Sequence, residues 1–216
     1  MSKISRGWKV SLIIFLVLAA DQTLKFWVKT HMTLHDDIQI FNWFHISFTE
    51  NNGMAFGIEL FDKIFLTSFR IIASGVLIWY LYKICSKSTT RFGYCVCISL
   101  ITAGAMGNIL DCLFYGIIFN DSTGQIASLF PAGGGYGSFF YGKVVDMLYF
   151  PLIDTWWPDW MPFVGGDHFV FFRPVFNMAD SAITVGIIIL LLFYRRDLSE
   201  VPTSEEKETV VDSTDK

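Results

Sequence analysis

Charged side chains are scarce in this chain of 216 residues: only 17% are Asp, Glu, Lys or Arg, while 53% are hydrophobic. The mean hydropathy is +0.47. A soluble domain has about a quarter of its residues charged, so this composition excludes one and indicates a polytopic membrane protein. The sequence also lacks an internal repeat and any basic stretch typical of nucleic-acid binding.

Cysteine and metal-binding patterns are equally sparse. The sequence has four cysteines, which are Cys85, Cys95, Cys97 and Cys112. Cys-x-Cys is poor spacing for zinc, so we interpret all four as small apolar residues without a disulfide framework. His31 and His35 have i, i+4 metal spacing, but no third ligand is evident. We therefore expect neither a metal nor a cofactor.

Four hydrophobic stretches are long enough to cross a bilayer, at about residues 8–29, 64–84, 92–110 and 175–194. Each has the ~20 residues that cross a hydrocarbon core of ~30 Å. The first is interpreted as an uncleaved span, because Leu18 is too bulky for a signal-peptide cleavage site. We expect one membrane-embedded domain over residues 1–196. The acidic tail at 197–216 is predicted to be disordered.

The positive charges predict the orientation of these spans. They lie before the first span, between the second and third, and after the fourth, at Lys3, Arg6, Lys9, Lys83, Lys87, Arg91, Arg195 and Arg196. Positive clusters favour the cytoplasmic side, so both termini are predicted to be cytoplasmic. The predicted fold is thus a membrane α-helical protein with four transmembrane helices, and residues 30–63 and 112–174 lie on the outer side.

The outer segments carry weaker signals of their own. Residues 38–48 alternate imperfectly between apolar and polar, and residues 143–149 resemble another short strand, so a small outer-face β-sheet cradle is predicted. Asn51-Asn52-Gly53 is a turn signal. Residues 120–142 are glycine-rich and predicted to form a flexible loop. The aromatic residues at 156–172 are typical of the membrane interface, where they anchor the chain or cover a lipid-binding cleft.

Five carboxylates converge on the outer face in this arrangement: Asp21, Glu50, Asp111, Asp146 and Asp180. An ionised carboxylate in or near hydrocarbon costs several kcal/mol unless it is paired. Each of the five is therefore a candidate functional residue.

Asp146 and Asp180 are the candidates for catalysis. Two close carboxylates share a proton, so one acts as a general base on water while the other polarises a scissile carbonyl. In the alternative interpretation each Asp caps a helix or pairs with a cation, for which the candidates are Lys25, Lys143 and Arg173. Asp180 and Asn177 are both candidate N-caps of the last span.

The remaining polar residues of the spans are interpreted as supporting ones. Asp21 and Lys25 have the i, i+4 spacing of a helix ion pair. Asn108 and Asp111 are expected to orient a catalytic group. The small residues around Gly104 indicate close helix packing or room for a substrate backbone. Arg70 is expected to extend toward the interface or to pair with a carboxylate.

Five sequence blocks occur in order at residues 21–25, 51–57, 104–111, 144–146 and 176–181. Together they resemble the lipoprotein signal peptidases (signal peptidase II) of bacteria. The resemblance covers about residues 8 to 195. It implies an aspartic dyad that cleaves prolipoproteins on the amino side of a diacylglyceryl-modified cysteine, at the periplasmic face of the inner membrane.

Matched by position, the resemblance implies that Asp146 and Asp180 form the dyad. The supporting residues that it implies are Asp21, Lys25, Asn51, Gly53, Gly104, Asn108, Asp111, Asn177 and Ala179. The implied partners are lipid-modified prolipoproteins, membrane lipids and globomycin-type inhibitors. A carboxylate-lined transporter and a non-catalytic lipoprotein-binding protein are the alternative functions.

The chain departs from the family pattern at three places. Cys112 stands where members commonly carry Arg, and we expect Lys143 or Arg173 to compensate for that charge. The connection from Asp111 to Asp146 is much longer than usual, and the aromatic segment before Arg173 is enlarged. The enlarged periplasmic loops leave the dyad residues in place.

Overall fold

The computed structural model describes residues 5–52 and 63–199. Among these residues, three helices are long and apolar enough to cross a membrane: α1 (Arg6–His31), α2 (Lys63–Cys85) and α3 (Phe92–Leu110), which continues through η1 (Asp111–Tyr115) and α4 (Gly116–Ile118). A shorter apolar helix, α5 (Met178–Phe193), is followed by α6 (Arg195–Ser199). This arrangement agrees with the predicted multi-pass helical membrane protein.

The last apolar helix begins later than we predicted. Val175 and Phe176 form strand β6, which pairs with strand β3, and Asn177 caps the helix by accepting a hydrogen bond from the Asp180 backbone N–H. The cap is therefore Asn177 rather than Asp180. With 16 residues, α5 is about 24 Å long. The sequence did not reveal the boundary between β6 and α5, because the residues of the strand and of the helix are similarly hydrophobic.

The helices place apolar side chains outward and polar ones inward. Large side chains such as Phe15, Ile72 and Leu192 are exposed on the helix surfaces, whereas Lys25 and Asp111 are fully buried. This pattern suits a helix bundle surrounded by lipid, in which only the interior offers polar partners. α3 is the central helix, because its contacts with α1, α2 and α5 are the most extensive between helices.

Small residues bring α3 close to α5. A side chain at Gly104 would overlap the Ala179 carbonyl, and a Cβ at Gly107 would lie 2.8 Å from Asp21 Oδ2 and 3.1 Å from Ala179 Cβ. The packing interpretation of this face is thus confirmed, and Gly104 faces a helix rather than an open substrate channel. The close approach brings the start of α5 against the polar end of α3.

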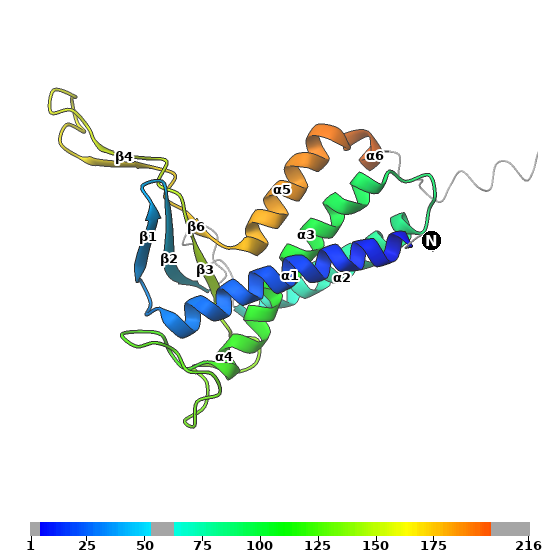
Figure 1. The fold of residues 1–216 in the computed structure, drawn as a ribbon, viewed down its shortest axis with the longest axis horizontal. Coiled ribbons are helices and arrows are strands. Elements are labelled where there is room, and N and C mark those ends of the chain that lie inside the picture. Colours follow the sequence, from blue (N-terminus) through cyan, green and yellow to red (C-terminus); the bar gives the residue numbers. More distant parts are fainter. Residues whose placement is uncertain (1–4, 53–62, 200–216) are drawn as a thin grey trace, which may run out of the picture.

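The predicted β-sheet is present and lies across the end of α1 that is remote from the N-terminus (Figure 1). Its strands are antiparallel in the order β1-β2-β3-β6, where β1 is Asp37–Phe41, β2 is Phe44–Asn51 and β3 is Val144–Tyr149. Residues 38–48 are therefore two strands rather than one. The turn at Asn42 and Trp43 explains why the sequence alternates imperfectly.

The two long segments at residues 120–142 and 149–172 differ from each other in how they pack. Residues 120–142 add no strand to the sheet, but they are tied to the domain by hydrogen bonds from Leu34 N to Ser122 O and from Tyr136 N to Phe119 O, both 2.9 Å. The aromatic segment forms a hairpin of β4 (Ile153–Trp156) and β5 (His168–Phe171) that projects beyond the sheet (Figure 1). The loop that we predicted to be flexible thus makes specific contacts.

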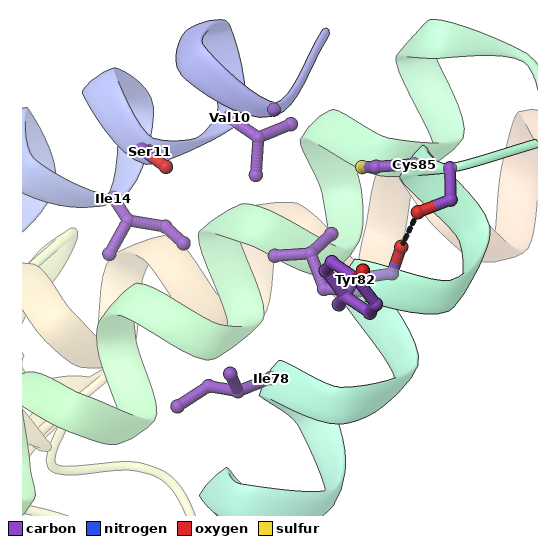
Figure 2. A pocket seen from close by; sticks show the side chains of 9 residues that line it. Val10, Ser11, Ile14, Ile78, Tyr82 and Cys85 are labelled. Atoms are coloured by element: carbon purple, nitrogen blue, oxygen red, sulfur yellow. Dashed lines mark hydrogen bonds between the residues drawn. The ribbon is translucent and has the colours of Figure 1, made fainter.

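An apolar cleft between α1 and α2 lies near the N-terminal end of α1, far from the sheet. Figure 2 shows Val10 and Ile14 of α1 facing Ile78 and Tyr82 of α2, with Cys85 at the edge. Among the residues that the structure describes, no carboxylate lines this cleft. The buried carboxylates lie instead at the opposite end of the bundle. The four cysteines are all free.

Close packing at Gly104 gives a testable prediction. Gly104→Ala is expected to cost about 1–3 kcal/mol of stability, because the new methyl group displaces the backbone of α5. Gly75→Ala is the matched control, since a Cβ added at Gly75 in α2 would meet no atom within 4 Å. Thermal unfolding in detergent measures both, and equal midpoints for the two variants would contradict the packing argument.

Candidate active site

Lys25 is the centre of a buried ionic group. Its Nζ lies 2.9 Å from Asp21 Oδ2 and 2.7 Å from Asp111 Oδ2, and it donates to Asn108 Oδ1 at 3.1 Å. The Asp21–Lys25 pair that we predicted is confirmed. Asp111 is an additional partner, contributed by the π-helical turn at the end of α3. One cation thus connects α1 to α3.

The two carboxylates beside Lys25 also hold backbone groups of other elements. Asp21 Oδ1 accepts a hydrogen bond of 2.9 Å from Ala179 N, and Asp111 Oδ2 accepts one of 3.2 Å from Val145 N. Ala179 and Val145 directly precede Asp180 and Asp146. Each supporting carboxylate therefore fixes the backbone next to one of the two candidate catalytic aspartates.

Two amide side chains connect Asp146 and Asp180. Asn177 Nδ2 donates to Asp146 Oδ1 at 2.7 Å, and Asn108 Nδ2 donates to Asp180 Oδ1 at 2.8 Å. Asn177 Nδ2 also lies 3.1 Å from Asn108 Oδ1. The structure thus brings all four of these predicted residues together in one hydrogen-bonded group.

The surroundings fix which way both amides point. Asn108 Oδ1 accepts from Lys25, so its Nδ2 must face Asp180. Asn177 Oδ1 accepts from the Asp180 backbone N–H, so its Nδ2 must face Asp146. Reversing either amide would place two donors or two acceptors against each other. Each aspartate consequently receives one side-chain donor and keeps a second oxygen for a proton or a ligand.

Asp146 and Asp180 differ in their exposure. Asp146 is only 5% exposed, whereas Asp180 is half-buried. The pKa of Asp146 is raised to about 7, first by burial and then by the negative charge of Asp180, against the opposing effects of Lys25 and Asn177. A carboxyl group with this pKa keeps its proton close to neutral pH. The pair can therefore offer one acid and one base together.

The other predicted supporting residues take different places. Asn51 pairs with Val144 in the β2–β3 ladder, one residue before Val145. Ala179 is fully buried against α3, and Gly104 allows that contact. Gly53 lies outside the described residues.

Two contributors were missed by the sequence analysis. Gln22 Nε2 bonds Asp111 Oδ1 at 3.0 Å and Asp21 Oδ2 at 3.1 Å, and Tyr115 donates to Gln22 Oε1 at 3.1 Å. Gln22 lies inside the block at residues 21–25, which was the available signal. Tyr115 gave no such signal, because its role depends on the π-helical turn.

The surroundings of Cys112, at the position where the family commonly carries Arg, differ from our prediction. Arg70 of α2 lies with Nη1 3.4 Å from Cys112 Sγ, and Cys112 is buried. Lys143 instead binds Glu50, and Arg173 is exposed. Arg70 therefore turns inward against a sulfur of η1, and no carboxylate within residues 5–52 and 63–199 is paired with it.

Within residues 5–52 and 63–199, no group of three His, Cys, Asp or Glu side chains is placed to hold a metal ion. His31 Nδ1 instead lies 2.9 Å from the Trp27 carbonyl, on its own helix.

The fold and this centre define a polytopic membrane protein with a carboxylate site beneath a small β-sheet. The family model for signal peptidase (SPase) II matches residues 13–195. Lipoprotein signal peptidases are 52% identical over 92% of this chain and 88% of the relative (Porphyromonas gingivalis), and 37% identical over 95% and 86% (Amoebophilus asiaticus). The chain belongs to the signal peptidase II family and is an aspartic peptidase of that type, which removes signal peptides from prolipoproteins.

A solved structure is also similar. It is described as a bacterial membrane enzyme determined by the in meso method at 2.3 Å resolution, with 25% identity and a TM-score of 0.59. The similarity covers 95% of this chain and 98% of that one. The long segments at residues 120–142 and 149–172 are thus accommodated on a shared fold.

The buried ionic group predicts a large effect of removing its cation. Lys25→Met is expected to cost about 3–5 kcal/mol, because it leaves Asp21 and Asp111 buried without a counter-charge. The triple variant Asp21→Asn/Lys25→Met/Asp111→Asn should recover most of that loss, since no unpaired charge remains. Denaturation in detergent measures both. A Lys25→Met variant as stable as wild type would disprove the arrangement.

Proposed function

We propose that Asp146 and Asp180 are the catalytic pair with which this chain cleaves diacylglyceryl-modified prolipoproteins. The observation that carries this proposal is the pair of carboxylates fixed by separate amide donors, of which one is buried and the other partly open. Two acids held in unlike environments are suited to opposite roles in one hydrolysis.

The roles follow from the environments. Protonated Asp146 donates a hydrogen bond to the scissile carbonyl, while ionised Asp180, the more exposed of the two, takes a proton from water. The water oxygen attacks the carbonyl carbon, and the carbonyl oxygen receives the Asp146 proton. The tetrahedral intermediate then collapses: Asp180 returns its proton to the leaving nitrogen, Asp146 takes a proton back from one of the two hydroxyls, the C=O bond re-forms and the C–N bond breaks. The products are the carboxylic acid of the signal peptide, which ionises in water, and the amine of the lipidated cysteine.

An apolar groove beside Asp180 supports a lipid-modified substrate. It is lined by α1, α3 and α5, at Leu16, Val17, Ala20, Leu100, Met178, Ser181, Ala182 and Val185. Acyl chains attached to the substrate cysteine would remain in an apolar environment along this groove while the peptide bond meets the carboxylates. A peptide inhibitor of the globomycin type would compete at the same carboxylates.

The proposed topology has four spanning helices, both termini in the cytoplasm and the site at the periplasmic face of the bacterial inner membrane. In support, Arg6 Nη1 bonds the carbonyls of Lys87 and Thr90, and Arg91 lies 3.4 Å from Asp197 Oδ2. These contacts gather the basic clusters at one end of the bundle, opposite the sheet (Figure 1). Positive clusters favour the cytoplasmic side.

The proposed domain is residues 1–196. In the proposed acidic tail at 197–216, residues 200–216 lie outside the described residues.

The carboxylates gather at one end of the bundle instead of being spread across its length, which favours hydrolysis over transport.

Removing either carboxylate tests the proposal directly. Asp146→Asn and Asp180→Asn are each expected to reduce cleavage of a diacylglyceryl-modified prolipoprotein by at least about 10³-fold, because one acid or base is lost. Asp154→Asn is the matched control, since Asp154 lies exposed in strand β4. Mass spectrometry of the product measures cleavage before the lipidated cysteine. Full activity in either dyad variant would refute the assignment.

The pKa of Asp146 predicts the pH dependence. Because that pKa is raised to about 7, the pair keeps its shared proton below this pH and loses it above. The kcat should therefore fall as pH rises past about 7, approaching tenfold per unit. Initial rates from about pH 5 to about pH 9 at saturating substrate test this. A kcat that stays constant to the alkaline end would contradict the role of Asp146 as the acid.

A further inference from the structure

A second buried ionic cluster involves Glu50, the one of the five carboxylates that belongs neither to the catalytic pair nor to the group around Lys25. Lys29 Nζ lies 2.6 Å from Glu50 Oε1, and Lys143 Nζ lies 2.9 Å from Glu50 Oε2. The side chains of Lys29 and Glu50 are 0% and 3% exposed. Glu50 therefore bridges two cations with its two oxygens.

Aromatic rings and a hydroxyl complete the surroundings of Lys29. Its Nζ lies 5.7, 5.4 and 5.1 Å from the ring centroids of Phe48, Phe119 and Tyr136, and it donates to Ser122 Oγ at 2.7 Å. These distances allow cation–π attraction, which helps to offset the cost of burying the ammonium. Ser122 and Tyr136 both belong to the long segment at residues 120–142. The unusual insertion thus forms one wall of the cluster.

The cluster acts on the strand that carries Asp146. Glu50 lies opposite Val145 in the β2–β3 ladder, and Thr49 lies opposite Asp146. Lys143 directly precedes β3, and its backbone N–H donates to the Tyr136 hydroxyl at 2.7 Å. The start of β3 is thus held by both the side chain and the backbone of Lys143.

The cluster also connects β3 to α1. Lys29 follows Asp21 and Lys25 at intervals of four residues, so the three side chains lie along one face of α1. Lys25 fixes α3 and, through Asp21 and Asp111, the backbone beside both aspartates, while Lys29 fixes β2 and β3 through Glu50. One face of α1 therefore fixes the positions, along the bundle, of the two elements that carry Asp146 and Asp180.

A buried ion pair contributes little net stability compared with apolar residues of similar size, so stability alone gives a weak reason for this cluster. Its geometry supports a different role. We propose that Lys29, Glu50 and Lys143 form a clamp. They are positioning residues that hold β3 where Asp146 lies beside Asp180, and residues 120–142 form one fixed side of this clamp.

The test rests on the proposed cleavage activity and compares single-charge variants. Glu50→Gln removes the bridging charge, and Lys143→Gln removes the partly exposed cation, which the fold tolerates more easily. Both are expected to lower kcat by about 10- to 100-fold, because a displacement of the order of 1 Å at a reacting group has that effect. The KM should change by less than about twofold, since the lipid-binding surfaces are untouched.

Two matched variants separate positioning from general damage. Lys143→Arg keeps the cation opposite Glu50 and should retain most of the wild-type kcat. Asp154→Asn changes a carboxylate outside the cluster, 52% exposed in the β4–β5 hairpin, and should leave kcat unchanged. All rates are taken per folded enzyme, measured by size-exclusion chromatography and thermal unfolding in detergent.

The outcomes distinguish this inference from the proposed function. If wild type does not cleave the lipidated prolipoprotein, the proposed function itself fails. If wild type cleaves and folded Lys143→Gln and Glu50→Gln keep the wild-type kcat, the clamp is refuted. A lower melting temperature with unchanged kcat would show that the cluster is merely structural, and would overturn the inference as well.

Discussion

The contact of Lys25 with Asp21 and Asp111 is the interaction on which the rest of the centre depends. Two carboxylates buried together would repel each other, and the ammonium between them makes their burial possible. Once paired, each still has oxygen lone pairs for the backbone N–H groups of Ala179 and Val145. The same ammonium orients the Asn108 amide toward Asp180. A single cation thus positions three separate elements around the candidate catalytic pair.

The membrane explains why so much of this positioning is ionic or hydrogen-bonded. In lipid, apolar burial does not drive helices together, so association relies on close packing and polar contacts. Gly104 and Gly107 supply the close packing between α3 and α5, and the polar face of α1 supplies the contacts. Packing sets the distance between helices, while Asp21 and Lys25 fix the position of α1 along α5 and α3. The site needs both, because its two aspartates come from a strand and a helix that are far apart in sequence.

The sequence predicted the features whose signals are local. The apolar runs indicated the helices, the i, i+4 spacing indicated the Asp21–Lys25 pair, and the ordered blocks indicated the family. The errors arose where local signals are ambiguous: the β1–β2 hairpin was interpreted as one strand, and β6 was merged into the last span. The partners of Glu50 and the inward turn of Arg70 had no local signal at all. Lys143 was one of several candidate partners for the two aspartates, and its actual pairing with Glu50 had no local signal either.

Residue identity by itself determined that this protein spans a membrane and that Asp146 and Asp180 are the candidate acids, because hydropathy and carboxylate position are properties of the chain. Tertiary structure alone decided which acid is buried, which way each amide points and which cation pairs with which carboxylate. Those choices depend on contacts between residues as distant as Asp21 and Ala179. Hydrogen bonds and desolvation act over a few ångströms in space, so no pattern along the chain specifies them.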